Sequence, residues 1–190
     1  LTIATPTIMH YEHAKECIAA KKHALIEKPF AVNVFEAQDI IALSEKNGTI
    51  IAVGYIERFN PAVIKLIDLV KDKKIVSIKT ERIAPPAERA NDVSAVFDLM
   101  IHDIDIILEI THSLPANITA AGKKINSEVF NEVYSDMIMK NGIKAELFST
   151  KMANKKSRKI TVDCEDCIYE ADLISKLIIE KKATGEKHIQ

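Results

Sequence analysis

Up to residue 54, short extended patterns alternate with longer segments whose apolar residues keep helical spacing. The short patterns, at residues 1–4, 23–26 and 49–53, predict buried strands. The longer ones predict helices over about residues 7–20 and 33–47, with Thr7 and Asn33 as N-caps, Glu36 completing a capping box, and Gly48 ending the second helix. This alternation implies a parallel sheet with helices on both faces.

Beyond residue 55 the pattern changes to two helices and a series of strands. Asn60-Pro61 predicts the start of a helix, and a second helix is expected over about residues 97–111. Asn141-Gly142 lies between two strand patterns and is a strong hairpin signal. The strand patterns cover residues 75–83, 117–125, 131–140, 143–151, 158–163 and 167–171. The sequence therefore predicts a parallel α/β unit followed by an α+β domain with a mostly antiparallel sheet, with the border near residue 55.

Both ends suggest a piece of a longer protein. Leu1 begins a strand that is already under way, without a preceding Met, and residues 180–190 stop where a new extended segment could begin. We expect further chain on both sides.

Composition narrows the class of protein. The 190 residues are 47% hydrophobic and 28% charged, as in ordinary globular proteins, and the net charge of -1 argues against a nucleic-acid partner. No apolar run reaches the roughly 18 residues of a membrane helix. Three cysteines do not form a disulfide framework, so we expect reduced thiols and a cytoplasmic protein.

Glu27-Lys28-Pro29 places a charged pair at the carboxyl end of a predicted parallel strand. Ligands of open α/β sheets bind at this edge, and Pro29 restricts the turn that presents Lys28. The alternative is a solvated lysine in a surface turn.

A second polar pattern lies on the helix predicted over residues 97–111. Asp98, His102 and Asp105 follow one another at spacings of four and three, and residues 109 and 112 continue the stripe, whereas Phe97, Ile101, Ile104 and Leu108 form the expected apolar face. A carboxylate one turn before an imidazole can orient it as a general base. The alternatives are a solvent-facing helix side and a metal site made by Asp98, His102 and Asp105.

Two further patterns indicate turns rather than sites. Cys164 and Cys167 form a CxxC without a second pair or suitably spaced histidines, which excludes a four-cysteine zinc site within the chain. We interpret it as an incidental turn. The basic run over residues 151–159 lacks aromatic residues and is expected to be a solvated hairpin loop. No metal ligand set is predicted.

Four motifs occur in an order and spacing that resemble the glucose–fructose oxidoreductase / inositol dehydrogenase / MocA family. The resemblance implies that residues 1–55 are the C-terminal portion of a Rossmann NAD(P)-binding domain, beginning at its fourth strand. Residues 56–190 would be an α+β domain for substrate binding and oligomerisation, incomplete at its C-terminus. The motifs are Ala4-Thr5-Pro6-Thr7 with His10, Lys22 to Pro29, Arg58-Phe59-Asn60-Pro61, and Asp98 with His102-Asp103-Ile104-Asp105.

The resemblance also implies roles for individual residues. Lys28, His102 and Asp98 would be catalytic. Thr5, Pro6, Glu27 and Lys28 would lie against the cofactor, and Arg58, Asn60 and Asp105 would contact the substrate. The chain departs from the family in two ways: it contains no GxGxxG phosphate-binding loop, and Val93, Ser94 and Ala95 replace the glycines that precede the family's aspartate.

The implied function is NAD(P)-dependent oxidation of a secondary alcohol of a sugar, cyclitol or sugar nucleotide, with UDP-N-acetylhexosamines as the suggested subclass. The cofactor would be NAD or NADP, bound weakly by this chain alone because the phosphate-binding half is absent from it. Alternatives are a non-catalytic ligand-binding or regulatory protein of the same fold and a metal-dependent hydrolase using Asp98, His102 and Asp105.

The family resemblance further implies a homodimer or homotetramer that forms through the C-terminal sheet. We expect alternate apolar residues of its strands to form the contact face. These residues are Val133, Met137, Met139, Ile143, Ala145, Leu147, Ile160 and Val162.

Overall fold

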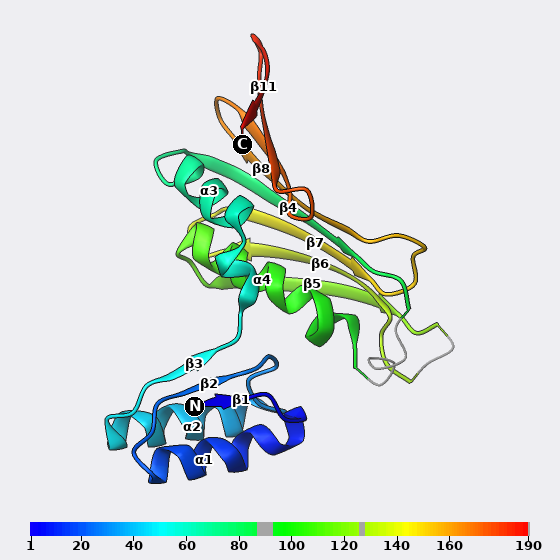
Figure 1. The fold of residues 1–190 in the computed structure, drawn as a ribbon. Helices are drawn as coiled ribbons and strands as arrows, with labels where there is room; N and C mark the ends of the chain where they lie inside the picture. The colour runs from blue at the N-terminus through cyan, green and yellow to red at the C-terminus, as the bar shows by residue number, and fades with distance from the viewer. Residues whose placement is uncertain (87–92, 126–127, 190) are drawn as a thin grey trace. The chain divides into compact units, whose positions relative to one another are not determined.

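The computed structural model describes residues 1–86, 93–125 and 128–189. The chain divides into two compact units, Leu1–Ile56 and Glu57–Gln190 (Figure 1). Within the described residues no helix is long and apolar enough to cross a membrane.

The first unit is a three-stranded parallel sheet with its helices on one side. The strands run in the order β1-β2-β3, and helices α1 and α2 pack against each other on the same face (Figure 1). The expectation of helices on both faces is therefore wrong for these residues. Right-handed crossovers between strands that follow one another in order place every connecting helix on the same face. The elements are β1 (Thr2–Ile3), the 3₁₀ turn η1 (Thr7–Met9), α1 (His10–Ala19), β2 (Ala24–Ile26), α2 (Val34–Asn47) and β3 (Ile51–Val53).

Helix α2 begins and ends where the sequence predicts. The Asn33 Oδ1 atom accepts a hydrogen bond from the Glu36 backbone N–H at 2.9 Å, and Gly48 ends the helix with φ of 63°. The predicted Thr7 cap is wrong. The chain enters α1 through the tighter turn η1, in which the Met9 N–H donates to the Pro6 carbonyl, and Thr7 lies inside this turn without capping.

The core of the first unit lies between the sheet and its two helices. On the opposite face of the sheet, Thr2, Leu25 and Ala52 form one register row, and Leu25 is 39% exposed. The buried hydrophobic residues are Ile3, Ala14, Ile18, Ala24, Ile26 and Ile40.

The second unit is an eight-stranded sheet in the order β11-β10-β9-β8-β4-β7-β6-β5, with helices α3 and α4 on one face (Figure 1). Among the strands that the structure describes in this sheet, only β4 and β7 pair in parallel, so the predicted mostly antiparallel sheet is confirmed. The short turn η2 (Ile56–Phe59) leads into this unit. The remaining elements are α3 (Pro61–Val70), β4 (Ile75–Ile83), the π turn η4 (Val96–Met100), α4 (Ile101–Thr111), β5 (Pro115–Lys123), β6 (Glu132–Met139), β7 (Lys144–Thr150), β8 (Ser157–Cys164), β9 (Ile168–Asp172), β10 (Leu177–Lys182) and β11 (Gly185–Ile189).

Strands β10 and β11 were not predicted. Five of their eleven residues are charged, and ion pairs add to the apolar contact that Ile178 and Ile189 make with the core. Lys181 Nζ lies 2.9 Å from a Glu170 carboxylate oxygen on β9 and 3.8 Å from one of Glu186 on β11. Strand prediction from apolar patterns does not detect such a hairpin.

The helix-covered face of the large sheet carries the residues that were expected to form an oligomer contact. That expectation is wrong because Val133, Met137, Met139, Ala145, Leu147, Ile160 and Val162 are buried and Ile143 is partly buried, all in one cluster with residues of α3 and α4. The opposite face presents Tyr134, Ile138 and Phe148, and the Tyr134 and Phe148 rings stack with centroids 4.4 Å apart.

Candidate functional site

Two turns of the first unit leave the carboxyl ends of neighbouring parallel strands. Thr5 and Pro6 follow β1, and Glu27, Lys28 and Pro29 follow β2. The turn after β2 is fastened at its start, because the Glu27 N–H donates to the Ile3 carbonyl at 2.9 Å. Lys28 is half-buried, and the Lys28-Pro29 peptide bond is cis. The sequence therefore brings Thr5, Pro6 and Lys28 to one edge of the sheet, where ligands of open α/β sheets bind.

Glu27 lies against the chain as it leaves β3. A Cβ atom added at Gly54 would come within 3.0 Å of a Glu27 carboxylate oxygen, so a side chain at position 54 would displace that carboxylate. The Gly54 N–H donates to the Ile26 carbonyl at 2.8 Å. The two contacts keep the Glu27 turn close to the end of β3.

Helix α1 holds the turn after β1 with two histidines. The Nδ1 atom of His13 lies 3.1 Å from the Thr5 hydroxyl oxygen. His10 is only 1% exposed, and its ring nitrogens lie 2.9 Å from the carbonyl oxygens of Thr5 and Pro29. His10 belongs to the first motif, but the sequence analysis gave it no role. The signal that could have indicated one is a histidine at a position that α1 buries.

In the second unit, Asp98 lies in the π turn η4 and His102 follows at the start of α4. Asp98 is half-buried and His102 is buried. π turns inside helices occur often at functional sites. Here the turn changes which residues share a face, so Phe97 is 50% exposed rather than part of the expected apolar stripe, and Ile106, Ile107 and Ile110 are buried instead.

Arg58 and Asp105 bind each other. Arg58 donates from Nε and Nη2 to the two Asp105 carboxylate oxygens at 2.7 and 2.8 Å, and its Nη1 lies 2.9 Å from Glu109. Such a two-point contact fixes the plane of the guanidinium. Because both Asp105 oxygens are engaged by Arg58, Asp105 is poorly suited to bind a metal ion. The part of the chain with described coordinates holds no group of three or more His, Cys, Asp or Glu residues that could bind one.

The Asn60 amide is occupied within the second unit. Its Oδ1 atom accepts from the Ala62 N–H at 3.1 Å, which caps α3, and its Nδ2 donates to Glu57 and to the Leu173 carbonyl, both at 3.0 Å. Both amide hydrogens are therefore used. This geometry favours a role in fixing the segment that carries Arg58 over contact with a substrate.

Beneath this segment lies a buried ion network that sequence reasoning missed. Arg82 on β4 is 1% exposed and donates from Nε and Nη2 to Oδ1 of Asp103 on α4, at 2.9 and 2.7 Å. Its Nη1 donates to Glu57 in η2 at 2.9 Å, and Arg158 on β8 donates to the same oxygen at 2.8 Å. The sequence signal that could have indicated this network is an arginine on the same face of β4 as Ile78 and Thr80.

Burial and ion pairing act in opposite directions on the two carboxylates of this network. Burial raises the pKa of Asp103 above its ordinary value, although Arg82 attracts the ionised form. Burial also acts to raise the pKa of Glu57, but hydrogen bonds from Arg82 and Asn60 and the charge of Arg158 outweigh it and leave that pKa below its ordinary value.

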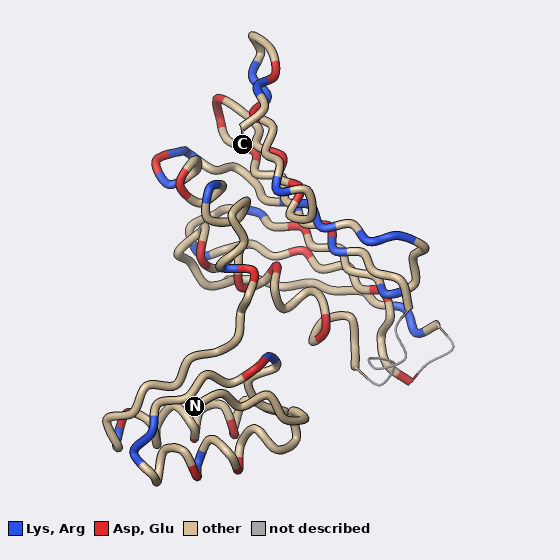
Figure 2. Tube along the Cα trace, viewed as in Figure 1, with Lys and Arg blue, Asp and Glu red and all other residues tan. Residues whose placement is uncertain are grey.

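The CxxC and the basic run contribute no site chemistry. Cys164 and Cys167 are buried at the β8–β9 hairpin, with the Cys164 N–H donating to the Cys167 carbonyl, and burial raises the pKa of the Cys164 thiol to about 12. The interpretation as a turn fits this geometry. Figure 2 shows basic residues along the connection from β7 to β8, but Lys151 is buried and donates to the Val93 carbonyl, so the loop is solvated only in part.

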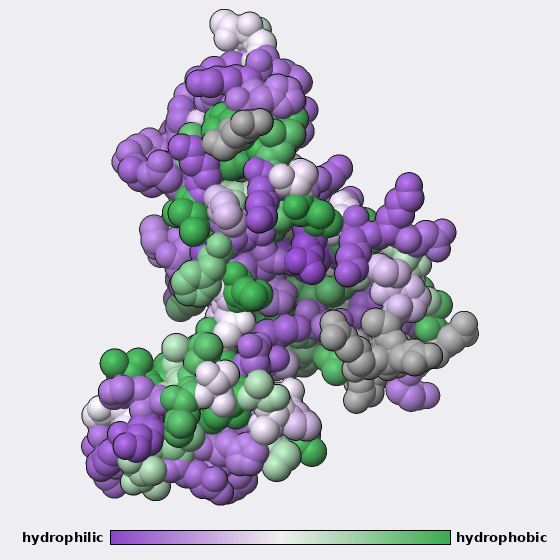
Figure 3. Space-filling model, viewed as in Figure 1, coloured by the Kyte–Doolittle hydropathy of each residue, from purple (hydrophilic) through white to green (hydrophobic). Residues whose placement is uncertain are grey.

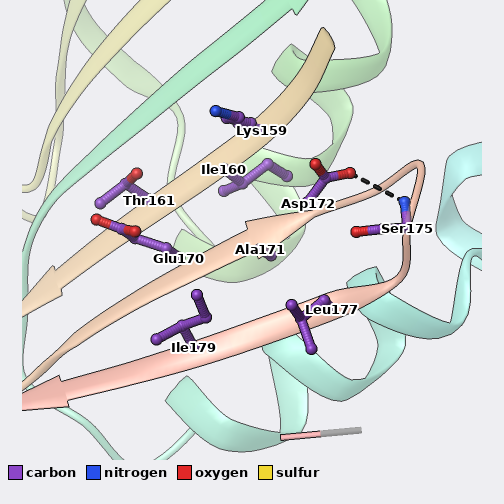
Figure 4. Close-up of a pocket in the computed structure, with 9 residues that line it drawn as sticks. All are labelled: Lys159, Ile160, Thr161, Glu170, Ala171, Asp172, Ser175, Leu177 and Ile179. Atoms are coloured by element: carbon purple, nitrogen blue, oxygen red, sulfur yellow. Dashed lines mark hydrogen bonds between the residues drawn. The ribbon is translucent and has the colours of Figure 1, made fainter. Parts of the chain in front are cut away.

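A hollow of about 360 Å³ lies on the helix-free face of strands β8, β9 and β10. Two cross-strand rows, Lys159-Asp172-Leu177 and Thr161-Glu170-Ile179, form this face, whereas Ile160 and Ala171 lie at the alternate positions and are buried on the other face (Figure 4). None of the residues predicted for the site lines it. The lining residues are Lys159, Ile160, Thr161, Glu170, Ala171, Asp172, Ser175, Leu177 and Ile179.

Residues 1–55 match the model of an oxidoreductase family with an NAD-binding Rossmann fold, the glucose–fructose oxidoreductase / inositol dehydrogenase / MocA family. A UDP-N-acetylglucosamine 3-dehydrogenase from Acidithiobacillus ferrooxidans is 29% identical over 175 residues, which cover 92% of this chain and 56% of that protein. Its solved structure superposes with a TM-score of 0.93 over all of this chain and 62% of its own, at 26% identity. The family resemblance drawn from the motifs is confirmed.

Two further proteins extend the comparison. A scyllo-inositol 2-dehydrogenase (NAD(+)) from Bacillus subtilis is 28% identical over 142 residues, covering 71% of this chain and 41% of that protein. An inositol dehydrogenase homologue from Azotobacter vinelandii, solved with NADH and myo-inositol, has a TM-score of 0.91 over all of this chain and 55% of its own, at 14% identity, which shows a shared fold. The chain thus spans about half the length of these proteins.

Proposed function

We propose that this chain is part of an NAD(P)-dependent oxidoreductase that oxidises a secondary alcohol of a sugar, cyclitol or sugar nucleotide. The match of residues 1–55 to an NAD-binding oxidoreductase family carries this proposal. The dehydrogenases of sugar nucleotides and inositols among its relatives support the substrate class. As the motifs imply, we propose that residues 1–55 contact the cofactor and residues 56–190 contact the substrate.

The residues present suit the nicotinamide end of the cofactor. The turns holding Thr5, Pro6, Glu27 and Lys28 share the ligand-binding edge of a parallel sheet, and the absence of a side chain at Gly54 lets the Glu27 carboxylate lie against the end of β3. The glycines of the chain form no phosphate-binding loop, so these residues would hold only one end of NAD or NADP. When bound, the cofactor supplies a hydride acceptor.

The chain's own residues would supply charge and proton transfer. Lys28 would stabilise negative charge as it develops on the substrate oxygen. His102 would accept the hydroxyl proton, and Asp98, one turn earlier, would orient the imidazole and stabilise its protonated form. The elements that carry these residues, the turn after β2 and the π turn leading into α4, are both typical locations of functional residues.

Arg58 is the best candidate for substrate recognition in the second unit. Its guanidinium is held in one plane by Asp105 and Glu109, yet the side chain is 44% exposed. An oriented, accessible guanidinium suits an anionic or hydroxyl-rich ligand. We therefore propose that Asp105 and Asn60 position Arg58, and that Arg58 makes the contact. A sugar nucleotide, in particular a UDP-N-acetylhexosamine, fits this chemistry best.

The protein's surroundings are also proposals. Three free cysteines suit a reducing compartment, and we place the protein in the cytoplasm. In place of the buried residues that the sequence suggested, our candidate for contact between copies of the chain is the helix-free face of the large sheet, with Tyr134, Ile138 and Phe148 exposed or half-buried. A monomeric mass in sedimentation at tens of micromolar would contradict this contact.

The test uses the full-length protein with NAD and NADP and a panel of UDP-N-acetylhexosamines, inositols and aldoses. The Lys28→Ala variant should lose at least about a hundredfold in kcat, because removal of one preorganised charge typically costs that much. The exposed Lys22, which precedes the amino end of the same strand, provides the matched control as Lys22→Ala. Near-normal turnover of Lys28→Ala would remove Lys28 from the mechanism, and no cofactor reduction with any substrate would contradict the function.

A variant of His102 provides a second, independent test of the proposed function. A histidine base makes the rate rise with pH until the imidazole is unprotonated. The His102→Asn variant should lose this rise, while Lys22→Ala keeps it. An unchanged pH profile in His102→Asn would assign the base to another residue.

A further inference from the structure

His10, the first residue of α1, links the turns that follow two neighbouring strands, β1 and β2. Its Nε2 atom lies 2.9 Å from the Thr5 carbonyl oxygen, and its Nδ1 atom lies 2.9 Å from the Pro29 carbonyl oxygen. Thr5 lies in the turn after β1, and Pro29 lies in the turn after β2. The ring thus spans the gap between the carboxyl ends of two adjacent strands.

The chemistry of this contact is demanding. Carbonyl oxygens only accept hydrogen bonds, and a neutral imidazole has one N–H, so both contacts are hydrogen bonds at once only when both ring nitrogens carry a proton. The side chain is almost completely buried, where an unmade hydrogen bond is costly. A histidine that only filled space at this position would not need polar partners on both sides.

His13 gives a contrast on the same helix. It lies one turn after His10 and contacts the same residue, but through the Thr5 hydroxyl, whose oxygen is 3.1 Å from His13 Nδ1, and its side chain is only half-buried. His13 therefore touches one turn, whereas His10 touches both. A change at His13 can alter Thr5 without altering its spacing from Pro29.

We infer that His10 is a positioning residue that sets the spacing between the Thr5-Pro6 turn and the Lys28-Pro29 turn. This rests on the proposed function, in which the first turn contacts the cofactor and the second carries Lys28. The spacing matters because small displacements of a catalytic group reduce its effect strongly. His10 itself contacts neither cofactor nor substrate in this proposal.

Three substitutions separate the two halves of the bridge. The amide nitrogen of Asn can take the place of Nδ1, so His10→Asn keeps the link to Pro29 and loses that to Thr5. The amide nitrogen of Gln can take the place of Nε2, so His10→Gln keeps the link to Thr5 and loses that to Pro29. His10→Phe keeps a ring of similar size and loses both, and His13→Phe is the control.

The first measurement is the carbonyl ¹³C chemical shift of Thr5 and of Pro29 in the 190-residue chain, which needs no activity. We expect His10→Asn to shift the Thr5 signal and His10→Gln to shift the Pro29 signal. His13→Phe should leave the Pro29 signal unchanged. If His10→Phe does not fold, the opposite effects of the other two variants on the two carbonyl signals still test the bridge. Equal perturbation of both carbonyls by Asn and Gln, or none, would overturn the bridge.

The second measurement is kinetic and uses the full-length protein. His10→Asn releases the cofactor turn and should raise the cofactor KM by about tenfold, with kcat less affected, whereas His10→Gln releases the Lys28 turn and should lower kcat by about tenfold, with KM less affected. A purely structural role predicts that both variants lose both properties alike, and that result would overturn the positioning role. A wild-type protein without nicotinamide-dependent activity would overturn the proposed function, and with it the kinetic part of this inference, while the carbonyl shifts report on the bridge itself.

Discussion

Residues 1–56 and residues 57–190 secure their functional segments by different means. In the first unit, a single buried imidazole links two turns through backbone carbonyls. In the second unit, the segment that carries Arg58 is held by charged side chains, with Glu57 bound by Arg82 and Arg158. The first arrangement uses one ring and two neutral carbonyls, whereas the second must offset the large cost of removing several charges from water.

The hydrophobic cores of the two units also differ. The first unit has a small core on one side of its sheet, and hydrophobic residues are scattered over its surface (Figure 3), including Ile8 at 79% and Phe35 at 83% exposure. The second unit encloses a continuous core between its sheet and helices α3 and α4. A buried ion network needs such a core around it, because the burial of the surrounding apolar side chains provides the stability that the network itself does not.

The strongest test of this contrast is Arg82→Met. The substitution keeps a long side chain but leaves Asp103 buried without its cation and removes one of the two arginines at Glu57. We expect a loss of about 3 to 5 kcal/mol in the unfolding free energy, as when one partner of a buried pair is removed. Urea unfolding followed by circular dichroism measures it.

Arg158→Met is the matched control for Arg82→Met. Arg158 binds the same Glu57 oxygen, but its side chain is 40% exposed, so we expect about 1 kcal/mol or less. Equal losses in the two variants would show that burial does not distinguish these arginines, and the contrast between the units would lose its basis.

The second test uses the pH dependence of Glu57→Gln. The pKa of Glu57 is held below its ordinary value of 4.5, so its ionised form contributes stability that is present above the unfolded pKa and is lost as the pH falls through the folded pKa. Glu57→Gln should therefore cost about 1 to 3 kcal/mol at pH 7, with a smaller difference from the wild type at pH 3.

Denaturant titrations of both proteins at pH 7, 5 and 3 provide this comparison. Asp103 acts in the opposite direction, since its raised pKa means that protonation relieves part of its burial cost. Both proteins contain Asp103, so its effect largely cancels in the difference. A difference between wild type and Glu57→Gln that stays constant down to pH 3 would exclude an ionised Glu57 from the network.

The same contrast explains what the sequence predicts well and what it does not. Apolar spacing and caps predict β4 at residues 75–83 and α2 with its Asn33 cap, because those signals are local and carried by the residues themselves. Arg82 and Asp103 are 21 positions apart in the sequence, and nothing local indicates that they meet. The hairpin of β10 and β11 was missed for a similar reason, since the cross-strand ion pair of Lys181 with Glu186 leaves no local signal in the sequence.

The candidate site divides along the same line. Lys28, Asp98 and His102 are predicted from motifs, and they lie in the turn after β2, in the π turn and at the start of α4. The partners that hold the neighbouring residues were not found, because Arg58 with Asp105 and His10 with Pro29 are long-range contacts. A local pattern predicted Asn60 as an N-cap, but its further bond to the Leu173 carbonyl depends on the folded second unit.

The smallest expected effects come from the two Asn caps, one in each unit. Asn33 is exposed and forms a local capping box with Glu36, so Asn33→Ala should cost about 1 kcal/mol. Asn60 caps α3 and also donates to Glu57 and Leu173, so Asn60→Ala should cost about 2 kcal/mol, because two local hydrogen bonds and one tertiary hydrogen bond are lost together. Urea unfolding of the two variants, with amide hydrogen exchange to show which unit loses protection, measures both effects. Asn33→Ala should reduce protection only in α2 and the strands around it, and Asn60→Ala should reduce it in α3 and at β9. Equal costs would mean that the bonds from Asn60 to Glu57 and Leu173 add nothing to the cap, and the segment carrying Arg58 would then be fixed by ion pairs alone.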